Sequence, residues 1–481
     1  MTSDKFRRQL RQEAEQWWHS GLIDAALYDQ LAQRYRFDRL ENEARNRFTT
    51  ILISLGGILL GLGAITFVAA NWSVWSRTEK LALLLSVFLS VNIIGFWLWR
   101  SRDRGGGHKL GAALLLLGGL MLGANVGLVS QMFHQSGPLY ELLYVWSGGV
   151  WVMAIALRMP ALSILSVLLA GCAYFPASFD VPWTETLDIW QRVTIHLPLL
   201  TLLLFAPLAR LSRSGVTFCL TGLLLSVSVV GNILIWPTWA NLCACTLPPA
   251  LLWGYSNYSS PPWLPAFSAI AHRLTLIYLA ALFYLLSFRS WGWFRPNQAE
   301  AGWDWRWQIA LGLIGLTALA LWLWLRPRDR WQRWQFWRQP LALNSGSIGV
   351  MLLVTAAILS FLYAPHWSEL APELAELLFG RLSLVTVAFN VLFFGLAIAT
   401  IRDSLALGSR PAFWGGTILL VLGIATRMLE YNTDLLLKAF VLSACGIGVI
   451  LGGLWFERHI QAENAPRQFA PLTPTPNSHE T

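Results

Sequence analysis

The chain is long and strongly apolar: of its 481 residues, 55% are hydrophobic and only 13% are charged. Soluble domains carry roughly 25% charged residues, so a water-soluble fold is excluded because it could not cover this much apolar surface. The net charge of +9 resides mainly in basic residues between apolar runs, which favours loops of a membrane protein over a nucleic-acid-binding surface. The composition predicts an all-α, polytopic transmembrane bundle that contacts membrane lipids and no nucleic acid.

Residues 1–48 are polar and predict a small cytoplasmic helical hairpin ahead of the first span. Apolar residues recur there at helical spacing. Gly21 suits the end of a first helix, and Asp24 suits the N-cap of a second one. Two interpretations stay open. The hairpin is either a docking module for a protein partner or a solvated cap on the first span.

Apolar runs that approach or exceed the roughly 20 residues needed to cross a bilayer follow the hairpin. The first run, residues 51–70, carries Gly57 and Gly61 at the spacing that lets helices approach closely. Further spans are predicted at residues 81–99, 110–132, 141–157, 160–179, 190–209, 215–236, 238–255, 270–288, 307–325, 345–364, 382–401, 411–427 and 435–456. The total is about fourteen helices.

The spans divide the chain into successive regions. These are the hairpin (1–48), a four-helix transmembrane unit (49–160), a middle transmembrane region ending in a basic Trp/Arg loop (161–340), a C-terminal transmembrane unit (341–458) and a disordered tail (459–481). Residues 238–255 contain Pro248 and Pro249, so whether they span fully stays open. If they do, Arg100–Arg104 and Arg326–Arg338 lie on one side, which the positive-inside rule makes cytoplasmic together with both termini.

The third apolar run carries glycines at four-residue spacing and polar residues beside them. The glycines are Gly119, Gly123 and Gly127. With residues at the predicted outer ends of the first two spans, the polar residues define a candidate site: Asn71, Trp72, Arg77, Lys80, Asn125, Gln131 and His134. One interpretation is a polar pocket for a headgroup or solute. The other is interhelical contact, in which the glycines permit close packing and the amides bond across helices.

Charged residues near the last predicted turn form a second candidate: Arg427, Glu430, Asp434 and Lys438. Pairing Arg427 with Glu430, and Lys438 with Asp434, would offset the cost of placing charge in a membrane. The set is either a proton or ion relay or an ion-pair staple at the outer surface. His196, in the predicted sixth span with Arg192 one turn earlier, is a third candidate. It is either a functional histidine or a hydrogen-bonded structural one.

Enzyme motifs are absent: the chain has no P-loop, no GxSxG and no HExxH. All five cysteines lie inside apolar runs and none forms a CxxC pair. We therefore expect no catalytic residues, no cofactor and no metal, and we interpret the cysteines as packing residues.

Two stretches carry a family resemblance. They are ITFVAANWSVWSRTEKLALL, residues 65–84, and GLMLGANVGLVSQMFHQSGPLYELLYVW, residues 119–146. With the leading hairpin around Gly21–Asp24, residues 5 to about 160 resemble the predicted integral membrane proteins of bacteria and archaea known as domain of unknown function twenty-one fifty-seven. The resemblance implies a multi-pass protein of the bacterial inner membrane and no established activity.

These observations support two functional hypotheses. The first is a transporter-like or lipid- or solute-handling protein with its polar site among the early helices. The alternative is a non-catalytic membrane scaffold or assembly factor that binds partners through the hairpin and the glycine-rich helix faces. The motive for the alternative is the lack of paired charges deep in the spans, which coupled transporters usually need.

Overall fold

The computed structural model describes helical segments along most of the chain. The chain divides into two compact units, residues 1–89 and 90–481. The described residues are 4–35, 37, 55, 59, 66, 75–101, 106–134, 137–180, 187–232, 241–257, 265–288, 303–325, 343–363, 384–430 and 434–464. The first predicted span, including Gly57 and Gly61, lies almost entirely outside them.

In the first unit, helices α1 (Asp4–His19) and α2 (Ala25–Tyr35) pack against each other. Gly21 adopts a φ of +71°, a left-handed conformation that glycine accepts without strain. Asp24 Oδ1 accepts a hydrogen bond from the backbone N–H of Leu27 at 2.9 Å and so begins α2. The ring of Tyr28 stacks on Trp18. Burial, together with the nearby Glu15 carboxylate, raises the pKa of the Tyr28 phenol.

Most of the remaining helices are long and apolar, and only the segments from α8 to α10 are short. Their bounds are α4 (Arg77–Arg100), α5 (Gly106–Met132), α6 (Leu139–Leu157), α7 (Pro160–Phe179), α8 (Ile189–Ile195), α9 (Leu197–Leu200), η1 (Thr201–Phe205), α10 (Ala206–Leu211), α11 (Gly215–Gly231), α12 (Asn241–Ser256), α13 (Pro265–Leu286), α14 (Trp303–Leu325), α16 (Ser345–Tyr363), α19 (Leu384–Ala406), α20 (Arg410–Glu430) and α21 (Leu435–Asn464). No strand occurs in the described ranges.

Every predicted span from the second onward coincides with one of these helices or, for the sixth, with a helix pair. By length and composition, the described residues contain eight helices able to cross a membrane, or nine if a bent pair is counted as one span. The prediction of an all-α polytopic membrane bundle is confirmed. The total of fourteen spans stays a prediction. Residues 238–255 correspond to α12, which contains Pro248 and Pro249 and is one helix.

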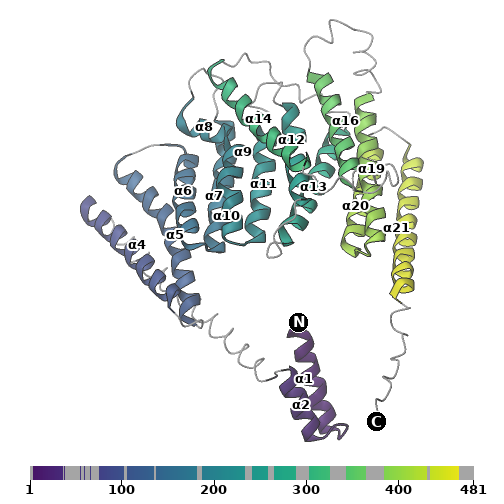
Figure 1. Cartoon of the computed structure of the whole chain (residues 1–481), viewed down its shortest axis with the longest axis horizontal. Helices are drawn as coiled ribbons and strands as arrows, with labels where there is room; N and C mark the ends of the chain where they lie inside the picture. The colour runs from purple at the N-terminus through teal and green to yellow at the C-terminus, as the bar shows by residue number, and fades with distance from the viewer. Residues whose placement is uncertain are drawn as a thin grey trace, which may run out of the picture. The chain divides into compact units, whose positions relative to one another are not determined.

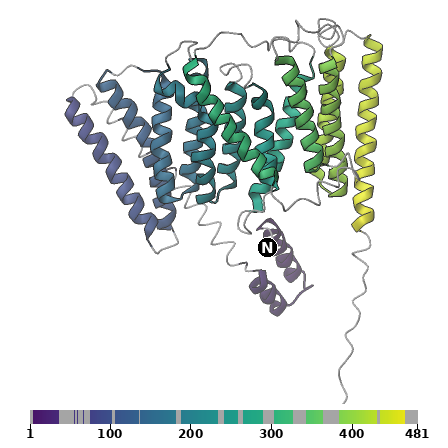
Figure 2. The same cartoon turned by 45° about the horizontal axis from the view of Figure 1, so that its top comes forward.

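Within the second unit, helices neighbouring in sequence mostly pack side by side (Figures 1 and 2). The succession α5, α6, α7, α11, α13, α19, α20 and α21 follows the chain, and α12, α14 and α16 pack together beside α11 and α13. Large apolar side chains such as Val391 and Ile314 remain exposed on the helix surfaces. In a membrane protein these surfaces face lipid, whose tails are as apolar as the side chains themselves.

Candidate functional site

The predicted sixth span is a broken helix instead of a continuous one. α8 meets the segment α9–η1–α10 at His196 with a bend of 70°. Pro198, in the first turn of α9, has no backbone N–H and cannot continue the hydrogen bonding of α8. η1 is a π-helical turn, a second irregularity of the kind often found at functional positions. The break therefore has a local cause in the sequence.

Asn232 supplies a hydrogen bond to the backbone at the break. Its side chain is fully buried at the end of α11. Asn232 Nδ2 donates to the carbonyl of Ile195 at 3.0 Å, and Oδ1 accepts from the Tyr174 hydroxyl at 2.9 Å. The same hydroxyl lies 3.0 Å from the carbonyl of Ser228. Because an unpaired backbone group in lipid is costly, these bonds stabilise the bend and connect α7, α8 and α11.

A second set of polar contacts holds the two halves of the broken helix against α6. The hydroxyls of Tyr144 and Thr194 are 3.1 Å apart, and the Tyr144 ring stacks on Trp190. Trp151 Nε1 donates to the carbonyl of Leu204 inside η1 at 3.1 Å. The buried Thr201 hydroxyl has no hydrogen-bond partner among the described residues. The break therefore combines satisfied backbone groups with one unused hydroxyl.

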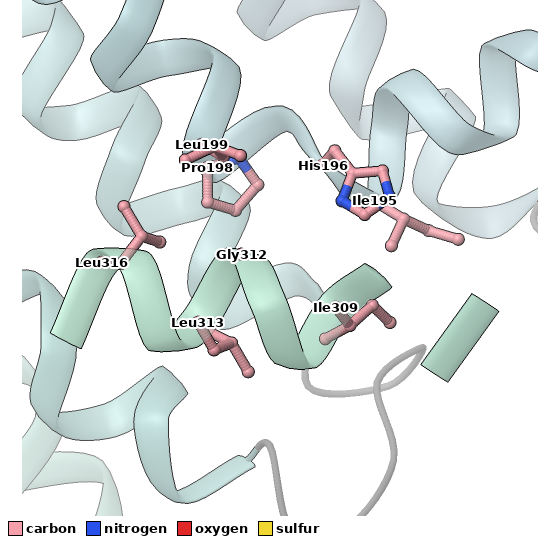
Figure 3. A pocket seen from close by; sticks show the side chains of 8 residues that line it. All are labelled: Ile195, His196, Pro198, Leu199, Ile309, Gly312, Leu313 and Leu316. Carbon is pink, nitrogen blue, oxygen red and sulfur yellow. The ribbon is translucent and has the colours of Figure 1, made fainter. Parts of the chain in front are cut away.

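A small cavity lies between the break and α14 (Figure 3). Its volume is about 10 Å³, close to the minimum that holds one water molecule. The lining residues are Ile195, His196, Pro198, Leu199, Ile309, Gly312, Leu313 and Leu316. His196 and Pro198 come from the break, and Gly312 lies opposite them on α14 (Figure 3). The histidine that the sequence singled out therefore lies at the bend, beside a cavity that holds nothing larger than one water molecule.

Acidic and amide groups surround one end of the same helices. The Tyr140 hydroxyl donates to Asp180 Oδ2 at 2.5 Å. Asp188 and Gln191 form a capping box at the start of α8, and Gln191 Nε2 donates to the carbonyl of Asp180 at 3.3 Å. The start of α6, the end of α7 and the start of α8 therefore meet at an acidic rim. Carboxylates at such a rim attract cations and polar solutes.

The polar set predicted among the early helices is only partly visible. Asn125 is buried in α5, whereas Gln131 and His134 are exposed at the end of that helix. Asn71 and Trp72 lie outside the described residues. Arg77 and Lys80 occupy the first turn of α4 in the other unit. A site that brings these residues together stays a prediction.

The glycines of the third run contact two neighbouring helices. The Trp146 ring of α6 lies directly over Gly123, and Trp146 Nε1 donates to the carbonyl of Gly119 at 2.7 Å. A Cβ at Gly119 would come within 2.8 Å of Leu162 in α7, whereas one at Gly127 would have ordinary contact with Leu142 at 3.8 Å. Close packing of the Trp146 indole explains Gly123, the Leu162 side chain of α7 explains Gly119, and Gly127 is less constrained.

The charged set near the last turn divides between two helices. Arg427 and Glu430 share α20 and form an ion pair of 2.5 Å. At the start of α21, Asp434 is exposed and Lys438 is half-buried. No ion pair between Asp434 and Lys438 is found in the part of the chain that the structure describes. Arg427 is buried, which places this charge among helices and away from the bulk solvent.

Comparison with known proteins assigns the class. The fold defines a polytopic helical membrane protein, and residues 15–163 match the family described as "Predicted membrane protein (DUF2157)". The match confirms the resemblance over the N-terminal third of the chain. No function is established for the chain, and no solved structure matches it.

Curated relatives carry transport in their names. A "Putative transport protein" of Klebsiella pneumoniae (strain 342) is 29% identical over 137 residues, which cover 25% of this chain and 24% of that protein. A second protein with such a name, from Klebsiella pneumoniae subsp. pneumoniae, has the same identity and coverage. The alignment thus spans about a quarter of the length of these relatives.

Proposed function

We propose that the chain is a transporter-like protein of the bacterial inner membrane that moves or handles a small polar solute at the broken helix. The observation that carries the proposal is the 70° break at His196 inside an otherwise apolar segment. Irregular backbone at membrane depth is tolerated only where protein buries it or it lines a water-filled cavity. Discontinuous helices of this kind form the solute sites of many transporters. The names of the relatives agree with this proposal.

In the conformation described, the cavity beside His196 holds no more than one water molecule. Transport then requires the two halves of the broken helix to move relative to α14. Hinges absorb such motions at a few loop or helix-end positions, and the bend at His196–Pro198 is such a position. We propose no enzymatic step and no cofactor.

Cysteine accessibility on α14 tests the proposal. Leu316 lines the cavity and is 3% exposed, whereas Ile314, two residues earlier, is 63% exposed on the outer face of the same helix. In a background lacking the five native cysteines, we expect a membrane-impermeant thiol reagent to label Leu316→Cys. The lipid-facing Ile314→Cys should not react. If Leu316→Cys is as unreactive as Ile314→Cys from both sides of the membrane, the helices are simply packed and the transport proposal is wrong.

The orientation belongs to the same proposal. Because the helices alternate in direction, Arg158, Arg210 and Arg410 lie at one end of the bundle, and Asp180, Asp188 and Glu430 lie at the other. The positive-inside rule places the basic end in the cytoplasm, with both termini. Reporter fusions after Arg213 and after Asp180 should report opposite sides of the membrane. Identical reporter activity would contradict this orientation.

A scaffold that binds a protein partner is the second candidate. It is favoured by exposed apolar side chains near the hairpin turn, since Trp18, Leu22 and Leu27 are 44%, 74% and 45% exposed. Apolar surface kept in water often marks an interaction site. A photo-crosslinking residue at Leu22 should then capture one discrete partner, while the same residue at the exposed Asp29 of α2 should not. Equal crosslinking at both positions would leave the hairpin as a solvated cap.

A further inference from the structure

Arg427 is buried and makes several contacts, but not all of its hydrogen-bond donors have partners among the described residues. Its side chain is 8% exposed, Nη1 donates to the carbonyl of Ser287 at the end of α13, and the same nitrogen pairs with Glu430. The guanidinium carbon lies 4.0 Å from the centre of the Phe288 ring. The other terminal nitrogen, Nη2, is buried and has no hydrogen-bond partner among the described residues. Leaving a buried charged donor unpaired is unfavourable, so an acceptor from outside the chain would stabilise it.

The same arginine borders an open cavity on the surface of α19. The cavity has a volume of about 580 Å³ and is lined by Arg427 and Asn390 at its polar end. Asn390 Nδ2 donates to the carbonyls of Ser287 and Thr386, at 3.0 and 2.8 Å. Asn390 therefore fixes the wall, and Arg427 Nη2 is the donor that remains for a ligand. Volumes of this size are typical of small-molecule sites.

An apolar strip continues the cavity along α19, which packs directly against α20 (Figures 1 and 2). Val391, Gly395 and Ile398 lie on one side of the helix, and Val391 is 65% exposed. Apart from the adjoining residues and the backbone of α19 itself, no described atom lies within 4 Å of the position a Cβ would take at Gly395. Gly395, which has no side chain, therefore forms the bottom of a groove between the aliphatic side chains of Val391 and Ile398. At 1.5 Å per residue, Val391 to Ile398 covers roughly 10 Å along the helix.

We propose that this groove binds a membrane phospholipid, with a phosphate oxygen accepting from Arg427 Nη2 and one acyl chain lying over Gly395. A planar guanidinium is well suited to phosphate, and the exposed aliphatic strip matches an acyl chain. The neighbouring Glu430 leaves the pair without net charge, so the site accepts zwitterionic and anionic phospholipids alike. For the same reason, free inorganic phosphate, which has no tail to add binding energy, is a poor ligand. The groove involves α13, α19 and α20 and does not depend on the transport proposal.

Native mass spectrometry of the full-length protein in detergent tests the headgroup. Phosphatidylethanolamine and phosphatidylglycerol should each bind as a first, tightest lipid with affinities within about threefold of each other. Diacylglycerol with the same chains, which lacks the phosphate, should bind about tenfold or more weakly. A tenfold excess of inorganic phosphate should not displace the lipid. Equal binding of diacylglycerol, or displacement by inorganic phosphate, would overturn the proposal.

Two matched glycine variants test the groove without removing the arginine. Gly395→Leu fills the bottom of the groove, while Gly415→Leu adds the same side chain to an exposed glycine of α20 that also has open space around it. We expect the first to weaken phospholipid binding about tenfold, and the second to leave it within twofold. Arg427→Gln should weaken phospholipid binding about tenfold as well and leave diacylglycerol binding unchanged. If Gly395→Leu and Gly415→Leu bind phospholipid equally, the groove is not the site, whatever the stability of the arginine variant.

Discussion

Asn232 and Arg427 are two buried polar side chains that both hydrogen-bond to the backbone of a neighbouring helix. They differ in whether all of their polar atoms have partners. Each donates to a backbone carbonyl near a helix end, Asn232 to Ile195 and Arg427 to Ser287. Both hydrogen-bonding ends of the Asn232 amide have partners from the chain. Arg427 has one terminal nitrogen without a partner among the described residues, and it borders a cavity of about 580 Å³. We call the Asn232 network the closed site, because its polar atoms are paired and stabilise the helix arrangement. We call the Arg427 network the open site, because its unpaired nitrogen is a donor for a ligand.

The comparison also separates two kinds of motion. A transport step that moves α8 away from α7 and α11 must disturb the bonds that Asn232 makes between these helices. Such a step therefore begins from a stabilised closed state. Phospholipid binding at Arg427 needs only a local shift that uncovers the buried Nη2, because the cavity beside it is already open on the surface of α19. The first site is suited to switching, and the second to permanent occupancy by lipid.

The largest expected loss of stability comes from substituting Arg427, the buried arginine of the open site. Arg427→Leu leaves the Glu430 carboxylate half of a buried ion pair, and such changes destabilise proteins by about 3–5 kcal/mol. Removing both charges in Arg427→Leu/Glu430→Leu should recover most of that loss, because no unpaired charge remains. Unfolding in mixed detergent micelles measures both variants. If the double variant is as unstable as the single one, the ion pair does not explain the stability of α20.

A smaller loss is expected at the closed site. Asn232→Leu keeps a similar volume but removes the donor to Ile195 and the acceptor for Tyr174. The Ile195 carbonyl then loses its side-chain donor and the Tyr174 hydroxyl keeps only the Ser228 carbonyl, which predicts a loss of about 2 kcal/mol. Tyr174→Phe, which removes only the hydroxyl, should lose about half as much. The same unfolding assay checks both.

A double-mutant cycle over these two residues sharpens the comparison. Because they share a hydrogen bond, their combined effect should be smaller than the sum of the separate effects. Simple additivity would mean that the Tyr174 hydroxyl is stabilised by Ser228 alone.

The sequence predicted the membrane bundle well because period, length and composition are local signals. Pro198 was such a signal too, lying in the middle of a predicted span, and it marks the break that the span prediction omitted. Asn232 gave no comparable signal. Its importance arises from meeting Ile195 and Tyr174, residues 37 and 58 positions away, and such meetings are set by helix packing.

Arg427 lies between these extremes. Its pairing with Glu430 was predicted because the pair offsets the cost of placing charge in a membrane, and the structure contains that ion pair. Its contacts with Ser287 and Phe288 join residues about 140 positions apart and could not be predicted from the sequence. The polar residues in and just after the third predicted span show the converse. Asn125, Gln131 and His134 are close in sequence but differ in burial. Nearness in a sequence does not make a shared pocket.

The glycines of α5 also differ in how closely their neighbours pack against them. Substitutions at these glycines have the smallest expected effect on stability. A methyl group at Gly123 would collide with the Trp146 ring, whereas one at Gly127 would make only ordinary contact with Leu142 at 3.8 Å. Gly123→Ala should therefore lose about 1 kcal/mol through overpacking. Gly127→Ala should gain about 0.5 kcal/mol, because alanine loses less backbone entropy in a helix. Unfolding of the two variants side by side gives the measurement, and equal shifts in the same direction would show that close packing against α6 does not require glycine at position 123.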